Sequence, residues 1–319
     1  MKRSATFSIL ATILSCIFLV ITGCANSPNS QTAQPLSSYT VTDSKGHVIK
    51  LAHKPQRIVS LTIGTDEILM ELVPAERIAA LTYLADDSSI SNITAEAKRV
   101  SGKIRANPES VVSMAPDLVI AADWQAVELI QSIRDVGIAV YVYRTPNSIE
   151  EIKQAITEIS HVVGEKAAGA KLIAGMEAEL SQTGKKIKQV PLEKRQVVVN
   201  YTLMGGSGGK GSIFEDICQY AGVIDGAATV GLNRNGLLSK EQIIKINPDI
   251  LLLPDWDYTG KTDFNQYKSD LENDPALQQV KAIDNKKLIQ IPDRYMYSTS
   301  QYIVRGVTEI AKAAYPQYF

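Results

Sequence analysis

Cysteine and histidine are scarce in this sequence of 319 residues, which has only three of each. A single cysteine, Cys218, lies beyond residue 24, so we expect no disulfide within the folded body. The histidines at positions 47, 53 and 161 do not have the mutual spacing of zinc ligands. These absences argue against a resident metal site.

An excess of either charge is also missing, since 33 basic residues balance 34 acidic ones. Without a basic patch, nucleic acid is not an expected partner. No Ser-His-Asp set or pair of acid/base carboxylates is recognisable, and the glycine-rich stretch 204–212 departs from the phosphate-loop pattern at Met204 and Gly211. The sequence therefore predicts neither an enzyme nor a cofactor. A surface-anchored enzyme and a protein-binding receptor stay open as alternatives.

One long uncharged apolar run, residues 5–22, follows Lys2 and Arg3. A basic start followed by such a run is typical of a secretory signal, and the alternative is an N-terminal anchor helix. Cys24 ends the stretch ITGC, which is similar to a bacterial lipobox. We therefore expect residues 1–23 to be a lipoprotein signal peptide and Cys24 to carry the lipid.

The segment that follows, residues 24–38, consists largely of Ser, Asn, Gln and Pro and has no charge. Such a composition cannot bury enough apolar surface to fold, so it predicts a flexible tether. Two acyl chains such as palmitate on Cys24 would anchor the protein stably. The predicted location is the extracytoplasmic face of the cell membrane, with contact to the membrane through the lipid.

An internal repeat organises the body: residues 107–124, NPESVVSMAPDLVIAADW, match residues 239–256, SKEQIIKINPDILLLPDW. Glu109 is equivalent to Glu241, and the only two tryptophans, Trp124 and Trp256, occupy equivalent positions. Each copy has a good N-cap residue at its start and an apolar run before its Asp-Trp end. We predict a short helix followed by a buried strand in both copies.

Further apolar strands alternate with amphipathic helical segments, which predicts α/β lobes with mostly parallel sheets flanked by helices. The expected boundaries are 39–147 for the N-terminal lobe and 189–319 for the C-terminal lobe. Between them, residues 148–188 have helical apolar spacing over most of their length. One linker helix of about 60 Å would fit this pattern, and two helices broken near Gly164 are the alternative.

The expected binding site follows from the rule that ligands bind beyond the carboxyl ends of strands in open α/β sheets. The two tryptophans follow such strands, so we expect them to face each other across a cleft and to offer stacking surfaces to a flat or bulky ligand. The candidate ligand-binding residues are Trp124, Trp256, Tyr83, Asp123, Tyr201, Met204, Tyr258, Tyr295 and Tyr297.

Several stretches of the body resemble the class III, helical-backbone solute-binding proteins of ABC importers. They are KPQRIVSL at 54–61, TDEIL at 65–69, the two repeat copies, and GKGSI at 209–213. Their order and spacing, together with the lipobox and the linker region, carry the resemblance from Tyr39 onward. It implies a two-lobed binding protein whose partners are an ABC permease dimer and its ATPase.

The resemblance also implies roles for particular residues. In that family one surface Glu on each lobe docks onto the permease, and the matching positions are Glu109 and Glu241. The implied ligand is a bulky metal chelate, either a cobalamin-like corrinoid or a ferric siderophore, and import of either would be the biological role. Haem and an oxyanion such as molybdate are the other ligands that the resemblance leaves open.

Overall fold

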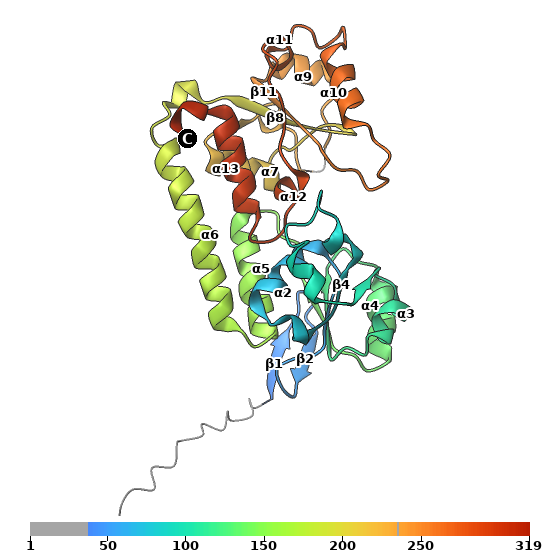
Figure 1. The fold of residues 1–319 in the computed structure, drawn as a ribbon. Coiled ribbons are helices and arrows are strands. Elements are labelled where there is room, and N and C mark those ends of the chain that lie inside the picture. Colours follow the sequence, from blue (N-terminus) through green and yellow to red (C-terminus); the bar gives the residue numbers. More distant parts are fainter. Residues whose placement is uncertain (1–37, 235) are drawn as a thin grey trace, which may run out of the picture. The chain divides into compact units, whose positions relative to one another are not determined.

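The computed structural model describes residues 38–234 and 236–319 (Figure 1). The expected signal peptide, Cys24 and the tether up to residue 37 lie outside the described residues. Within the described part, none of the helices combines the length and apolarity needed to cross a bilayer.

The first sheet has the strand order β5-β4-β3-β6-β7, and all of its pairs are parallel. It follows a short antiparallel hairpin, β1 (Tyr39–Thr42) and β2 (Val48–Leu51). Its central strands are apolar and fully buried, as strands covered on both faces should be. The strands are β3 (Ile58–Ser60), β4 (Ile78–Thr82), β5 (Lys103–Ile104), β6 (Leu118–Ala122) and β7 (Val140–Tyr143). The helices between them are α2 (Ile63–Leu72), α3 (Pro108–Ser113) and α4 (Val127–Asp135).

The second sheet has the order β10-β8-β11-β12, with β9 added antiparallel to β8. Its strands are β8 (Val197–Thr202), β9 (Gly205–Ser207), β10 (Ile224–Asp225), β11 (Ile250–Leu253) and β12 (Leu288–Gln290). The helices of this region are α7 (Ile213–Ala221), α8 (Gly226–Thr229), α9 (Lys240–Ile246), α10 (Phe264–Glu272), α11 (Lys281–Asp284), α12 (Asp293–Met296) and α13 (Ile303–Ala314). The α/β class with parallel sheets flanked by helices is thus confirmed. Below, the first lobe means the first sheet with α2–α4, and the second lobe means the second sheet with α7–α13.

Both repeat copies form the predicted helix and buried strand. The side chains of Asn107 and Ser239 cap α3 and α9, and Ser239 forms a capping box with Gln242. The strands that follow, β6 and β11, are completely buried near the centre of their sheets. Local caps and apolar runs therefore determine these two units.

The region between the sheets is not one continuous helix, so the prediction of a single 40-residue linker was wrong. It forms α5 (Ile149–Val162) and α6 (Lys166–Ile187), which pack against each other (Figure 1). The break lies at Gly164, whose φ of +75° favours glycine. Glu165 holds the turn through ion pairs with Lys54 at 3.0 Å and Arg77 at 2.6 Å. The alternative break near Gly164 is confirmed.

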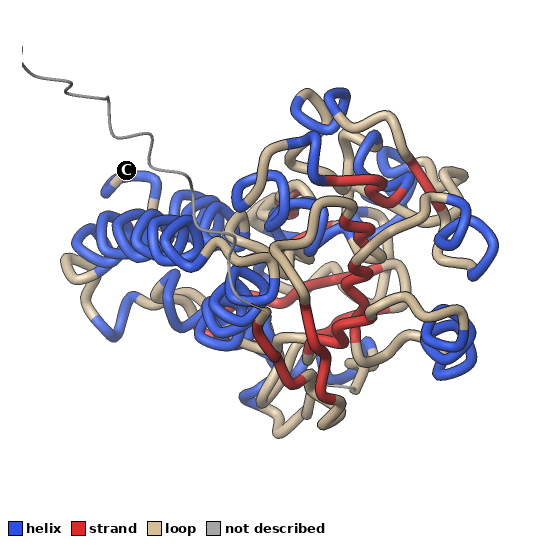
Figure 2. The backbone as a smooth tube through the Cα atoms, turned by 90° about the horizontal axis from the view of Figure 1, so that it is seen from below, coloured by secondary structure: helices blue, strands red, loops and turns tan. Residues whose placement is uncertain are grey.

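Among the described residues, one apolar cluster runs through both lobes, and each lobe also has a smaller cluster of its own. The shared cluster includes Ile58 and Leu118 of the first sheet, Ile156 of α5, Ile217 of α7 and Val307 of α13. In Figure 2 the long helices lie together on one side of the strands and shorter helices lie on the other side, and α6 contacts α2, α7 and α13. Because the shared cluster is continuous, separating the lobes completely would expose apolar surface that is buried here.

Candidate ligand-binding site

A cavity of about 880 Å³ opens where the strands of the first sheet end. Every strand of that sheet contributes residues just beyond its carboxyl end. These residues are Leu61 and Thr62 after β3, Tyr83 after β4, Arg105 after β5, Trp124 after β6 and Thr145 after β7. The cavity therefore occupies the place at which open α/β sheets generally bind ligands.

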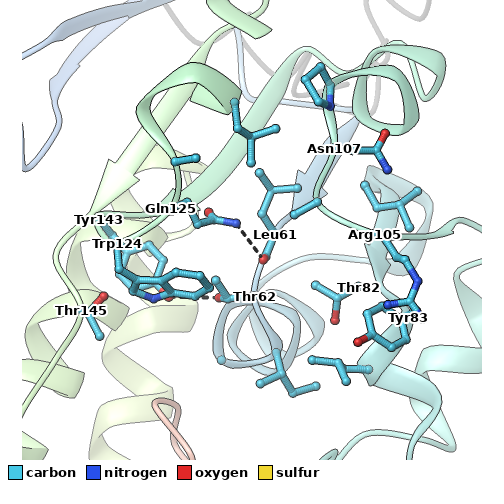
Figure 3. A pocket seen from close by; sticks show the side chains of 18 of the residues that line it. Leu61, Thr62, Thr82, Tyr83, Arg105, Asn107, Trp124, Gln125, Tyr143 and Thr145 are labelled. Atoms are coloured by element: carbon cyan, nitrogen blue, oxygen red, sulfur yellow. Dashed lines mark hydrogen bonds between the residues drawn. The ribbon is translucent and has the colours of Figure 1, made fainter. Parts of the chain in front are cut away.

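Trp124 is the largest aromatic surface in this cavity, and 67% of it is exposed. The buried Gln125 holds the loop that carries it. The Gln125 amide nitrogen donates to the Leu61 carbonyl at 3.3 Å, and its Oε1 accepts from the Ala122 N–H at 2.9 Å (Figure 3). Because Gln125 makes these backbone hydrogen bonds, the loop is fixed without the indole of Trp124. The indole is therefore available for stacking on a ligand.

Arg105 and Tyr83 form the opposite side of the cavity (Figure 3). The guanidinium carbon of Arg105 lies 3.8 Å from the centre of the Tyr83 ring, a cation–π arrangement. Among the described residues, no carboxylate lies within ion-pair distance of Arg105. Its charge is therefore available to an anionic group of a ligand.

Helices α2, α3 and α4 all begin at the cavity. Thr62 and Asn107 cap the first two with their side chains, whereas Ala126 before α4 makes no side-chain cap. The positive ends of the helix dipoles add to the charge of Arg105. The carboxylate of Glu128 also lines the cavity and partly offsets this potential.

Polar groups at the base of the cavity are fixed by hydrogen bonds. The Tyr143 hydroxyl lies 3.0 Å from the Thr62 hydroxyl, and burial raises the pKa of Tyr143 to about 12. Asp123, predicted as a ligand contact, instead accepts hydrogen bonds from the backbone N–H and the hydroxyl of Thr145, at 3.1 and 2.6 Å. The structure thus corrects this prediction: Asp123 braces the loops after β6 and β7.

Among the described residues of the second lobe, only Tyr258 and Thr299 line this cavity. Tyr258 is 73% exposed, so its ring is available to a ligand. Trp256 does not line the cavity, so the two tryptophans do not face each other across it as predicted. The indole N–H of Trp256 donates to Asp87 Oδ2 of the first lobe at 3.2 Å.

The other predicted contacts lie away from this cavity, whose walls do not include them. Tyr201 is only 7% exposed and packs against Tyr267, so it belongs to the core. Met204 is 77% exposed at the turn between β8 and β9. Tyr295 packs beside Arg294 and Arg305, and Tyr297 lies partly exposed after α12. The structure brings Tyr83, Trp124 and Tyr258 together, but not these four.

Arg105, Gln125 and Thr145 were missed by the sequence reasoning. Arg105 follows β5, which is only two residues long and leaves no apolar pattern in the sequence. Thr145 comes after the clearly apolar β7, so the strand-end rule could have found it. Within the described residues, no group of three or more His, Cys, Asp or Glu could hold a metal ion.

Glu109 and Glu241 each lie in the first turn of a short helix, and both are exposed. A hydrogen bond within the Ser239 cap lowers the pKa of Glu241 from its ordinary value. A negative side chain at this position is also stabilised by the helix dipole.

Comparison with known proteins identifies several relatives. An uncharacterized ABC transporter substrate-binding lipoprotein of Bacillus subtilis, YvrC, is 23% identical over all of this chain and 99% of its own length. The molybdate-binding protein MolA of Haemophilus influenzae is 22% identical over 96% of this chain and 90% of its own length. A cobalamin-binding protein of Halobacterium salinarum is 25% identical over 67% of this chain and 58% of its own length.

The fold is also found in a solved structure. The haem-binding protein RhuT of Roseiflexus sp. RS-1, in its apo form, has a TM-score of 0.70 and 22% identity, covering 82% of this chain and 99% of that one. Residues 58–295 match the family described as "Periplasmic binding protein", a span that includes both sheets. The chain therefore belongs to the family of periplasmic binding proteins.

Proposed function

We propose that this protein is the extracytoplasmic substrate-binding component of an ABC importer and that it captures a bulky metal chelate in the cavity beyond the first sheet. The family and the name of the YvrC relative support the importer assignment. The protein acts by binding and release, without catalysing a reaction. The enzyme and receptor alternatives lose support because the family and these relatives are binding proteins.

The observation that carries the choice of ligand is the size and lining of the cavity. Its 880 Å³ lies near the upper end of the range of about 300–1,000 Å³ typical of small-molecule sites. Trp124, Tyr83 and Tyr258 supply aromatic faces for a flat or bulky ligand, and Arg105 supplies one positive group for its anionic edge. A corrinoid or a ferric siderophore suits this combination, and a haem has a similar form.

An oxyanion such as molybdate is the second candidate. The unpaired guanidinium of Arg105 and the uncapped start of α4 favour it, and one relative is named for molybdate binding. A small oxyanion would leave most of the cavity, including the aromatic faces, without contacts. For that reason we place the chelate first.

Delivery to the transporter is assigned to Glu109 and Glu241. Each stands exposed on its own lobe, and the repeat places them at equivalent positions. A two-fold permease dimer could bind both with two equivalent positive pockets. The partners are therefore the permease dimer with its ATPase.

We assign membrane attachment to a lipid on Cys24 after removal of residues 1–23. The sequence ITGC supports this, as does the lipoprotein name of the YvrC relative. Replacement of Cys24 with Ser should abolish the incorporation of labelled palmitate into the protein. Equal incorporation into the parent and the Cys24→Ser variant would contradict the lipid anchor.

Ligand identity is tested with the purified protein by calorimetry and tryptophan fluorescence. The panel consists of cobalamin, ferric siderophores of the hydroxamate and catecholate types, haemin and molybdate. We expect one chelate to bind with 1:1 stoichiometry and to quench Trp124, which a Trp124→Phe variant would identify as the source. At 100 times its Kd this ligand should stabilise the fold by about 2.7 kcal/mol. Binding of molybdate alone would move the assignment to an oxyanion, and no binding by any member would contradict the proposal.

A further inference from the structure

The hydrogen bond between Trp256 and Asp87 crosses from the second lobe to the first beside the cavity. The indole N–H of Trp256 donates to Asp87 Oδ2 at 3.2 Å, and both residues are only half-buried. A partly exposed bond of this kind contributes modestly to stability and can open without unfolding the protein. We call this pair the cross-lobe tie.

Asp87 is held firmly by its own lobe. Its Oδ1 accepts hydrogen bonds from the backbone N–H of Ser89 at 3.0 Å and from the Ser89 hydroxyl. Burial by itself raises the pKa of Asp87. The hydrogen bonds from Ser89 and Trp256 together lower it by more, so the pKa lies below its ordinary value. Asp87 therefore presents a charged and oriented acceptor.

Trp256 is held just as firmly by the second lobe. Its backbone N–H and that of Asp255 both donate to Asp293 Oδ2, at 2.9 and 3.0 Å. In return, the backbone N–H of Asp293 donates to Asp255 Oδ1 at 2.8 Å. The loop after β11 is thus fixed to the start of α12, and the indole extends from a rigid base.

The tie joins the two segments that carry aromatic walls of the cavity. Tyr83 begins the 3₁₀ turn η2 (Tyr83–Asp86), which ends directly before Asp87. Tyr258 follows Trp256 by two residues and comes from the other lobe. A change in the distance between Trp256 and Asp87 would consequently change the distance between Tyr83 and Tyr258.

We propose that Trp256 and Asp87 are positioning residues that hold the Tyr83 and Tyr258 walls at the spacing needed to retain the ligand. This inference rests on the proposed function. Among the described residues that line the cavity, Tyr258 and Thr299 represent the second lobe. When the tie opens, the Tyr258 loop is held less firmly to the first lobe and the ligand leaves faster.

Three variants test the tie. Trp256→Phe keeps the aromatic ring and removes the donor, whereas Asp87→Ala removes the acceptor. Ser88→Ala is the matched control, because Ser88 is exposed next to Asp87, whereas the described hydrogen bonds to the Asp87 carboxylate come from Ser89 and Trp256. In stopped-flow measurements with the chelate identified by the panel, we expect the first two variants to release it about tenfold faster. The double variant should release it no faster than either single variant, since both changes remove one interaction. Unchanged release, or additive effects in the double variant, would overturn the proposal.

A second measurement needs no ligand and keeps the tie testable if the panel finds none. The chain has two tryptophans, so its ¹⁵N–¹H spectrum has two indole signals, and Trp124→Phe assigns them. We expect Asp87→Ala to shift the Trp256 signal alone and to speed hydrogen exchange in both segments 83–92 and 254–262. The control Ser88→Ala should leave the Trp256 signal and the exchange of segment 254–262 unchanged. An unmoved Trp256 signal in Asp87→Ala would show that the tie does not exist in solution, whatever the ligand panel gives.

Discussion

The carboxylate of Glu67 in α2 accepts a hydrogen bond from the hydroxyl of Ser300, a residue 233 positions later in the chain. Ser298 donates to the same carboxylate oxygen at 3.2 Å, and Asn92 donates to the other through its backbone and its amide. Glu67 is 1% exposed, so this polar joint between the lobes lies in the interior. Buried donors of this kind have no water to replace a lost partner.

Replacing Glu67 with Ala should therefore destabilise the whole body. The change leaves the hydroxyls of Ser298 and Ser300 and the amide of Asn92 without their acceptor, which we expect to cost about 3 kcal/mol. Chemical denaturation of both proteins measures the difference. Glu71→Ala, at an exposed position of the same helix, is the control and should stay within about 0.5 kcal/mol of the parent. If the Glu67→Ala and Glu71→Ala variants were equally stable, this would contradict a structural role for the polar joint.

Arg105 should govern the affinity for anionic ligands. Arg105→Gln removes the charge and leaves a shorter polar side chain beside Tyr83. We expect the Kd of an anionic chelate to rise about tenfold, as for the loss of one charge-assisted hydrogen bond. Calorimetry at two salt concentrations checks this, since the parent protein should show the stronger salt dependence.

Arg99→Gln is the matched control for this change, because Arg99 is exposed and does not line the cavity. Its Kd should equal that of the parent. If Arg105→Gln bound the anionic ligand as tightly as Arg99→Gln does, the guanidinium would have no part in recognition.

Removal of Glu109 and Glu241, the proposed docking residues, should separate transport from binding. In Glu109→Ala/Glu241→Ala, uptake by cells should fall to background, because each lobe loses its charged contact with the permease. The Kd of the purified protein should be unchanged, since neither residue lines the cavity. Glu76→Ala/Glu272→Ala changes one exposed glutamate on each lobe and should transport normally. Loss of ligand binding in the first double variant would refute a pure docking role.

The pH dependence of stability should contain a contribution from Asp66. Burial raises the pKa of this carboxyl from 3.8 to about 7, although hydrogen bonds from Ser60 and Thr82 oppose the shift. Between these two pH values the folded protein holds a proton that the unfolded chain releases. The stabilisation that comes from protonation of Asp66 is therefore complete below about pH 4 and is lost as the pH rises through 7.

Asp66→Asn keeps the shape of the side chain and removes its titration. The difference in the free energy of unfolding between the variant and the parent should grow in favour of the variant from pH 4 to pH 7, and then level off. Denaturation curves at several pH values measure this difference, which cancels the other titrating groups. A difference that does not vary with pH would show that Asp66 keeps an ordinary pKa.

The sequence predicted those features that short segments determine. The capped helices at Asn107 and Ser239 and the buried strands after them need only local signals. The break between α5 and α6 was only the alternative to the predicted single helix, because apolar spacing is the same whether a helix continues or folds back. Contacts of Glu165 with Lys54 and Arg77, about 90 to 110 residues away in the chain, accompany the turn.

The candidate site shows the same division. Tyr83 and Trp124 follow clear strands, so the strand-end rule placed them at the cavity. For Trp256 the internal repeat was misleading, because it describes equivalent positions within each lobe but not what lies opposite. Its partner, Asp87, has no counterpart in the repeat, and only the packing of the two lobes brings them together.

The one-sided construction of the cavity has a consequence for how such proteins can diversify. Most of its walls come from the carboxyl ends of the five strands of the first sheet, from the loops that follow them and from the helices α2, α3 and α4 that begin there. Exchanging those loops alone would be enough to change the chemical preference of the site. The second lobe, including Glu241, and the polar joint at Glu67 could stay as they are. Glu109 follows one of these loops closely and would have to be kept deliberately. A laboratory library confined to these loops is therefore the most economical route to a binder for a different chelate.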